Sequence, residues 1–201
     1  MKIEEIMQKR FSCRKFKDEK LKNEIVSEIL DSTRLSPSSV GLEPWEFVVV
    51  SKKDDLKKLG QICFDQSHVA NCSHAVVIFA RVDLQSKDKY LKEVIYSKNK
   101  GEEKAKRYFE FIASKTDLMS KDELFNYASL QCYIALANLV NIAYSKDVDS
   151  CIIGGFDREA LAKFIALPSQ FIPCVVVALG VGESRGGQKS RRTLEDVAIW
   201  F

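Results

Sequence analysis

The segment KRFSCRKF, residues 9–16, places side chains that bind anions at every second position. In an extended chain successive side chains point to opposite sides, so Arg10, Ser12 and Arg14 would face the same way. Two guanidinium groups and a hydroxyl on one side can form charge-assisted hydrogen bonds to a phosphate or another anion. An isolated triplet of this kind is more often a solvated basic patch, so both interpretations stay open at this point.

A second pair of cations stands near the other end, in the segment GGQKSRRTLEDVAIWF. Lys189 and Arg191 are again two apart, in a glycine-rich stretch that we expect to be extended. If folding brought the two ends of the chain together, the cationic side chains of both segments could bind one anion. A phosphomonoester, which carries nearly two negative charges, is an anion of the expected kind. The last residues, 197–201, are too apolar to remain in water, and we expect them to dock on another surface, such as a second subunit.

Other catalytic apparatus is scarce. The chain has two histidines and contains no G-x-S-x-G, no P-loop and no G-x-G-x-x-G that opens a helix after a strand. A zinc set could be drawn from Cys63, His68, Cys72 and His74, but the paired spacing of structural zinc sites is missing, so we predict no metal. A protein with anion-binding groups and few acid–base residues suits a cofactor that brings its own chemistry.

Composition sets broad limits. With 201 residues, 46% hydrophobic and 29% charged, the chain is an ordinary globular protein with one substantial core. A net charge of only +3 argues against a general nucleic-acid binder. The six cysteines lie singly and are expected to be reduced and buried. No signal peptide and no membrane span is visible, so we expect a cytoplasmic protein without a membrane partner.

Hydrophobic patterning predicts the elements that must position these residues. Continuous apolar runs predict strands at 46–51, 74–82, 151–156 and 173–182, in a sheet covered on both faces. Helical spacing predicts helices at 2–9, 21–30, 52–60 and 121–145. The last of these is apolar nearly all round from Leu130 to Ile142, which predicts either a central core helix or a subunit interface, and hence an oligomer.

The segment 84–120 differs from the rest, because it is rich in Lys and Glu yet carries spaced aromatic and aliphatic residues. We interpret it as a helical excursion from the main core, either a lid over a site or a peripheral insert. No repeat or linker divides the chain, so a single domain over 1–201 is expected.

Four motifs in this order resemble one known family across essentially the whole chain. They are RFSCRKF at 10–16, SPSS…PW at 36–45, IIGGF at 152–156 and KSR at 189–191. Together they are similar to the flavin-dependent nitroreductases. The resemblance implies an α+β fold, with a central, mainly antiparallel sheet flanked by helices, in an intertwined homodimer with FMN sites at the interface. The cysteine content and the pI of about 8.4 are also similar to a subgroup that activates metronidazole-type nitro prodrugs.

The resemblance also implies which residues contact FMN. The phosphate would be held by the cations of both termini and Ser12, while Arg14 would lie near flavin N1 and the C2 carbonyl. Residues 37–39 would reach FMN from the partner chain, and residues 152–155 would pass along the flavin face. The full implied set is Arg10, Phe11, Ser12, Arg14, Pro37, Ser38, Ser39, Gly41, Gln66, Ile152, Ile153, Gly154, Gly155, Lys189 and Arg191, with Phe109 on the substrate side.

This chain departs from the family pattern at four places. Phe11 stands where a histidine is frequent, Gly41 where an asparagine is frequent, and Gly154 where many relatives have glutamate. A second cation that some relatives carry before the 74–82 strand is missing, with Val69 the nearest residue. These departures imply fewer polar contacts to the cofactor and a more open flavin face.

The implied activity is a ping-pong oxidoreduction without a catalytic side chain. NAD(P)H would reduce flavin N5, and a nitroaromatic, nitroheterocyclic or quinone-like acceptor would then take the electrons on the same face. Two alternatives remain open. One is a flavin reductase or NAD(P)H oxidase of the same fold, and the other is a non-redox protein that binds phospholigands or nucleic acid through the two basic clusters.

Overall fold

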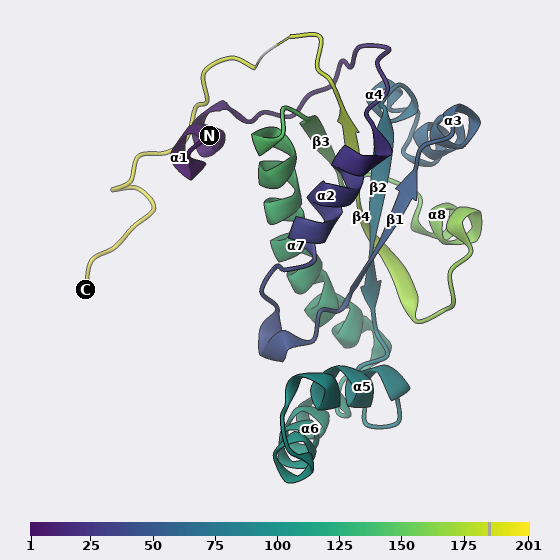
Figure 1. Ribbon diagram of the computed structural model, residues 1–201, viewed down its shortest axis with the longest axis vertical. Coiled ribbons are helices and arrows are strands. Elements are labelled where there is room, and N and C mark those ends of the chain that lie inside the picture. Colours follow the sequence, from purple (N-terminus) through teal and green to yellow (C-terminus); the bar gives the residue numbers. More distant parts are fainter. Residues whose placement is uncertain (185) are drawn as a thin grey trace.

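The computed structural model describes residues 1–184 and 186–201, and these residues form a four-stranded sheet between helices (Figure 1). The strands are β1 (Trp45–Val50), β2 (His74–Arg81), β3 (Asp149–Ile153) and β4 (Phe171–Gly180). Their order in the sheet is β1-β2-β4-β3, and every neighbouring pair is antiparallel. The chain therefore has the α+β class and the antiparallel sheet that the resemblance implies.

Helices cover both faces of this sheet. In chain order they are α1 (Ile3–Lys9), α2 (Asn23–Thr33), α3 (Lys53–Ile62), α4 (Ser67–Ala70), α5 (Lys89–Lys98), α6 (Glu102–Thr116), α7 (Lys121–Ser145) and α8 (Arg158–Ile165), with a 3-10 turn at Ser39–Gly41. Helices α2 and α7 lie on one side of the sheet and α3, α4 and α8 on the other (Figure 1). The short helices α4 and α8 were not predicted.

The two central strands show why the apolar runs are continuous. Along β2, Val76 and Ile78 belong to the core cluster with α2 and α7, while Val77 and Phe79 belong to the cluster with α3, α4 and α8. All four side chains are fully buried. Side chains alternate across a strand, so burial on both faces requires apolar residues at every position, which confirms the prediction of a doubly covered sheet.

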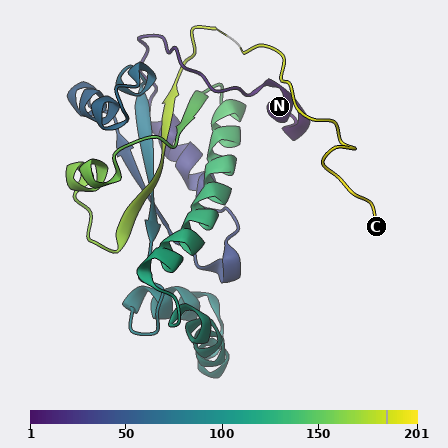
Figure 2. The ribbon, with the colours of Figure 1, turned by 180° about the vertical axis from the view of Figure 1, so that it is seen from behind.

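Helix α7 begins and ends where the sequence predicts. Ser120 caps its first turn, since its hydroxyl accepts from the Glu123 N–H and the Glu123 carboxylate accepts from the Ser120 N–H. One face of the helix is in the core, and the other leaves Leu130, Tyr133 and Ile134 exposed. The helix runs beside the strands of the sheet (Figure 2). The helix is apolar nearly all round because one face packs in the core of this chain and the other face forms a second apolar surface, which this chain leaves uncovered.

Helices α5 and α6 occupy most of the segment 84–120, which was expected to be helical. They extend beyond the sheet at the end opposite α1 (Figure 1). The Tyr90 hydroxyl ties α5 to the body, because it donates to the carbonyls of Leu42 and Glu43 at 2.8 and 2.9 Å. One strand prediction is wrong in its bounds: β3 ends at Ile153, so Gly154, Gly155 and Phe156 lie beyond the strand.

Candidate functional site

The first anion-binding segment lies along the edge of the sheet beside β3. The Cys13 N–H donates to the Ser150 carbonyl at 2.9 Å, and Ser12 pairs with Ser150 in an isolated parallel bridge. This pairing holds the segment extended, so Cys13 points into the core while Ser12 and Arg14 are exposed. Arg10, directly after α1, is half-buried. The predicted alternation is present for Ser12, Cys13 and Arg14 and ends there, because Lys15 is also exposed.

The C-terminal segment runs alongside this N-terminal segment (Figure 1). Phe16 pairs with Gly182 in an antiparallel bridge, and the Glu183 N–H donates to the Lys15 carbonyl at 3.0 Å. Gly186 then packs on Phe11 so closely that a Cβ there would lie 2.4 Å from the ring. Only glycine permits this approach, and it keeps the two ends of the chain together beyond the sheet.

The cations of the two termini converge as a result. The Lys189 ammonium donates to the Met7 carbonyl at the end of α1. Burial and the guanidinium groups of Arg10 and Arg191 lower the pKa of Lys189. Within residues 1–184 and 186–201, no carboxylate forms an ion pair with Arg10, Lys189 or Arg191. Three neighbouring cations without a paired carboxylate attract an anion.

A second part of the site lies at the end of β3. No residue that the structure describes lies within 4 Å of the place where a Cβ on Gly154 would be, so this backbone is open. Gly155 faces Gln66, whose amide donates to the carbonyls of Gly155 and Cys63 at 3.1 and 2.8 Å. Ile152 is exposed and Ile153 is in the core. The loop around Gln66 and the IIGG segment are therefore in direct contact.

Two residues near this loop were missed by the sequence analysis. The side chain of Phe64 is 66% exposed, and its backbone is left-handed with φ 58°. Its ring lies 3.8 Å from the place where a Cβ on Gly155 would be. His68 and Arg14 line the same small cavity, and burial and the Arg14 guanidinium together lower the pKa of His68. Val69, expected nearest to the missing cation, is fully buried in the core. The sequence feature that could have indicated this part of the site was His68, the residue before Val69.

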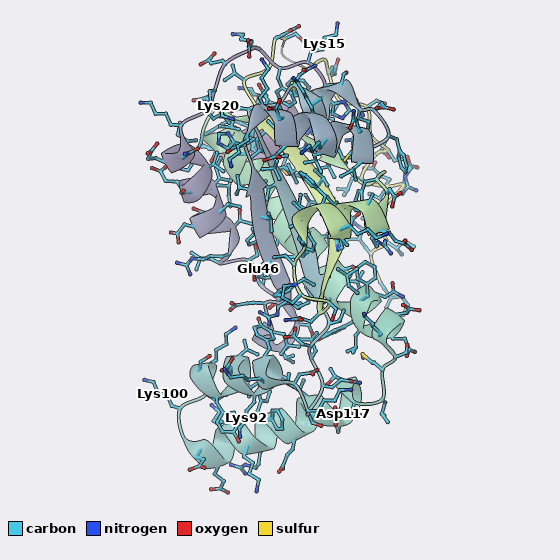
Figure 3. The ribbon with its side chains drawn as sticks, turned by 90° about the vertical axis from the view of Figure 1, so that its right-hand side faces the viewer. Lys15, Lys20, Glu46, Lys92, Lys100 and Asp117 are labelled. Atoms are coloured by element: carbon cyan, nitrogen blue, oxygen red, sulfur yellow. The ribbon has the colours of Figure 1, made fainter. Side chains whose placement is uncertain are left out.

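The remaining predicted residues lie elsewhere in this chain. The loop 37–41 packs near α7, where the Ser39 N–H donates to the Gln131 side chain at 2.8 Å. Phe109, on α6, packs edge-on against Tyr96 with ring centres 6.3 Å apart. Lys15, beside Arg14, lies at the opposite end of the molecule from Lys92 on α5 (Figure 3). A single copy of the chain thus does not bring Phe109 to the cationic residues.

Cys63, Cys72 and His74, which belong to the possible zinc set of residues 63–74, have roles in the fold other than metal binding. Burial raises the pKa of Cys63 to about 11 and that of Cys72 to about 12, and both ring nitrogens of His74 have hydrogen-bond partners. In the part of the chain that the structure describes, no group of three or more ligand-type side chains comes together. No described helix is both long and apolar enough to cross a membrane.

The fold and the candidate site define an α+β protein that carries a cationic cluster, built from both termini, at the edge of an antiparallel sheet. The sequence pattern of the Nitroreductase family matches residues 7–182. A protein of Staphylococcus saprophyticus, provisionally named an NAD(P)H nitroreductase, is 34% identical over 204 residues, covering 96% of this chain and 91% of the relative. The chain belongs to the nitroreductase family.

Solved structures agree with this assignment at the level of the fold. A nitroreductase-like protein from Streptococcus mutans has a TM-score of 0.88 at 21% identity, with 98% of this chain and 97% of that chain covered. A protein from Exiguobacterium sibiricum, provisionally described as a nitroreductase and solved in complex with FMN, has a TM-score of 0.84 at 21% identity, with 100% and 98% covered.

Proposed function

We propose that this protein is an FMN-dependent NAD(P)H oxidoreductase of the nitroreductase type. In this proposal it passes electrons by a ping-pong mechanism from NAD(P)H to nitroaromatic, nitroheterocyclic or quinone-like acceptors. The observation that carries the proposal is the contact of Lys189 with the Met7 carbonyl at the end of α1, which brings the C-terminal cations to Arg10, in a chain that belongs to this family. The name of the Staphylococcus saprophyticus relative supports NAD(P)H as the donor.

The residues present fit the phosphate of FMN. A phosphate dianion needs several charge-assisted donors, and the two termini supply two guanidinium groups, one ammonium and the exposed hydroxyl of Ser12. Phe11 contributes apolar packing against Gly186 in place of a polar contact. An anion bound there would relieve the electrostatic repulsion among the three cations. Its binding should therefore also stabilise the position of the C-terminal segment.

The fit extends toward Gly154, where the flavin ring would lie. When bound, FMN supplies the redox chemistry, accepting a hydride and releasing electrons to the acceptor. The open backbone at Gly154 lets a flat ring approach, and Gln66 is held beside Gly155. Arg14 is exposed and lies near Cys151 as well as His68. A fixed cation at this place stabilises negative charge on a reduced cofactor.

The proposal includes a homodimer in which the partner completes each site. Pro37, Ser38, Ser39 and Gly41 would reach the cofactor from the second chain, and Phe109 would line the acceptor side. Three features support this arrangement: the separation of the loop 37–41 from the cationic residues, the exposed apolar face of α7, and the exposed tail that ends in Trp200, 90% accessible, and Phe201. Apolar surfaces of this kind are typical of subunit interfaces.

The test starts from the purified protein. We expect a yellow preparation that releases FMN on denaturation and oxidises NADPH or NADH when a nitrofuran, metronidazole or a quinone is added without oxygen. A colourless protein that binds no added FMN, and whose ligand binding falls steeply with salt, would contradict the proposal and favour the non-redox alternative. Turnover that needs oxygen or free flavin, with no use of nitro acceptors, would favour the flavin reductase or oxidase alternative.

A further inference from the structure

His68 has a buried ring nitrogen without a partner. It lies on α4, and its Nε2 is inaccessible to solvent and makes no hydrogen bond to any residue that the structure describes. Its side chain lines a small cavity of about 120 Å³ together with Arg14, Asn71 and Glu183. A polar atom buried in this way costs on the order of 1–3 kcal/mol, so a native protein retains few of them.

The other histidine is a useful contrast. His74 is fully buried where His68 is half-buried, and its Nδ1 is bonded to the Ser73 hydroxyl at 2.9 Å and its Nε2 to the Asn23 side chain at 3.0 Å. That ring is fully satisfied by the protein and has a structural role between α2 and β2. His68 lacks such partners, and it lies beside a residue that the proposed function places at the flavin.

The charged groups around His68 come from three elements. Arg14 and Lys15 face it from the N-terminal segment, and Glu183 faces it from the chain after β4. On β3, Cys151 lies near Arg14, and burial raises the pKa of this thiol and keeps it neutral. Burial and Arg14 lower the pKa of His68, so the imidazole is neutral at neutral pH. A negative charge arriving in this pocket would offset Arg14 and favour the protonated ring.

We infer that His68 is a second contact to the bound flavin beside Arg14, and that its imidazole takes up a proton when the flavin is reduced. This inference rests on the proposed function. A hydride from NAD(P)H carries two electrons and one proton, so reduction adds one negative charge to the cofactor. His68 would take a second proton from water to balance this charge, and would return it to water when the acceptor removes the electrons.

The experiment measures the midpoint potential of the FMN-bound protein against pH, from pH 5.5 to 8.5, by spectroelectrochemistry. If two protons accompany two electrons, the potential falls with pH twice as steeply as it does with one proton. We expect the steeper slope in the native protein and half that slope in His68→Gln, which can form hydrogen bonds but cannot titrate. His68→Lys, with a fixed charge, should also show the one-proton slope.

The matched control is Ser67→Ala, an exposed neighbour of His68 on α4 with no assigned contact to the cofactor, which should retain the two-proton slope. The absorption spectrum of bound FMN and the melting temperature verify that each variant folds and holds the cofactor. A slope in His68→Gln equal to that of the native protein would overturn the inference while leaving the proposed function intact. Failure of the native protein to bind FMN would overturn both, so the two outcomes are distinguishable.

Discussion

At the scale of single residues, the site depends on the two-residue repeat between 10 and 14. The bridge to Ser150 keeps this segment extended, and Cys13 anchors it by pointing into the core. Ser12 and Arg14 must then face outward together. The two arginines of this repeat nevertheless have different surroundings, because Arg10 joins the cations of the C-terminal segment and Arg14 lies beside His68 and Cys151.

Replacing Arg14 by Ala should lower the flavin potential and slow turnover. The guanidinium is a fixed cation beside the expected position of the flavin ring, and its loss removes stabilisation of the reduced cofactor. We expect kcat to fall about tenfold or more, the equivalent of roughly 1.4 kcal/mol in the barrier. Potentiometry on the FMN-bound variant checks this, and a potential unchanged from the native protein would contradict the role assigned to Arg14.

Replacing Arg191 by Ala should weaken FMN retention instead. A hydrogen bond to a charged group contributes about 1.5–3 kcal/mol, so the Kd for FMN should rise roughly ten- to hundredfold. The neighbouring Arg192→Ala is the matched control and should change the Kd little. Fluorescence titration of the apoprotein with FMN measures both. Equal effects of the two substitutions would show that only the general charge of the segment matters.

At the scale of elements, buried polar contacts join α2 to the sheet. His74 lies between Asn23 and Ser73, and the Ser73 hydroxyl accepts from the Leu21 N–H at 2.7 Å. Burial and Lys20 lower the pKa of His74, so the folded protein holds this ring neutral. The Asn23 Oδ1 can only accept, so Nε2 carries the hydrogen of the neutral ring and Nδ1 accepts from the Ser73 hydroxyl, a bond that protonation of Nδ1 would reverse.

The lowered pKa of His74 should make the stability of the fold depend on pH. Below the ordinary histidine pKa of about 6.5 the unfolded chain binds a proton that the folded chain does not. The free energy of unfolding should therefore fall as the pH drops from about 6.5 toward the lowered pKa, by at most about 1.4 kcal/mol per pH unit for this group. Urea unfolding between pH 5 and 7.5 measures it, and His74→Gln should flatten the profile. A profile identical in the variant would refute the assignment.

Gly60, within α3, and Gly154, beyond the end of β3, should respond differently to replacement by alanine. A Cβ on Gly60 in α3 would lie 2.9 Å from the Cβ of Ala70 in α4, so Gly60→Ala should destabilise the fold by about 1–3 kcal/mol. Gly154→Ala meets open space, and its melting temperature should match that of the native protein. Thermal unfolding of the cofactor-free protein compares the two. A melting temperature for Gly60→Ala at or above the native value would mean that α4 can shift freely.

At the scale of the whole molecule, the single chain leaves apolar side chains exposed to water, which is energetically unfavourable. The tail carries Ile199, Trp200 and Phe201, all highly exposed, and it extends away from the body beside α1 (Figure 2). Helix α7 exposes Leu130 on a separate surface. Burying such residues is worth about 1.5–3 kcal/mol each, which favours their burial against a second subunit.

Deletion of residues 194–201 should therefore weaken the dimer, while Arg10, Lys189 and Arg191 remain in the chain. We expect the native protein to sediment as a dimer at micromolar concentration and the truncated protein to dissociate at least tenfold more readily. Leu130→Asp, on α7, is a second probe of the same assembly. Analytical ultracentrifugation measures both, and a native protein that is monomeric at all accessible concentrations would contradict the proposed dimer.

Much of this architecture follows from local patterns in the sequence. The bounds of α7, the four strands and the alternation of Ser12 and Arg14 were all predicted, because side-chain periodicity and capping act over a few residues. The short helices α4 and α8 were not, since helices of four and eight residues depend on tertiary packing for their stability. The end of β3 was misplaced because Ile152 and Ile153 do not reveal where pairing with β4 stops.

The meeting of distant groups could not be read from local patterns. Arg10 and Lys189 are far apart in sequence, and β3, β4 and Gly186 bring them together through pairing and close packing. His68 was overlooked for the same reason, because its place beside Arg14 results from the packing of α4 on one face of the sheet. Backbone periodicity is a local property of a chain, whereas contacts between its ends exist only after the core has closed.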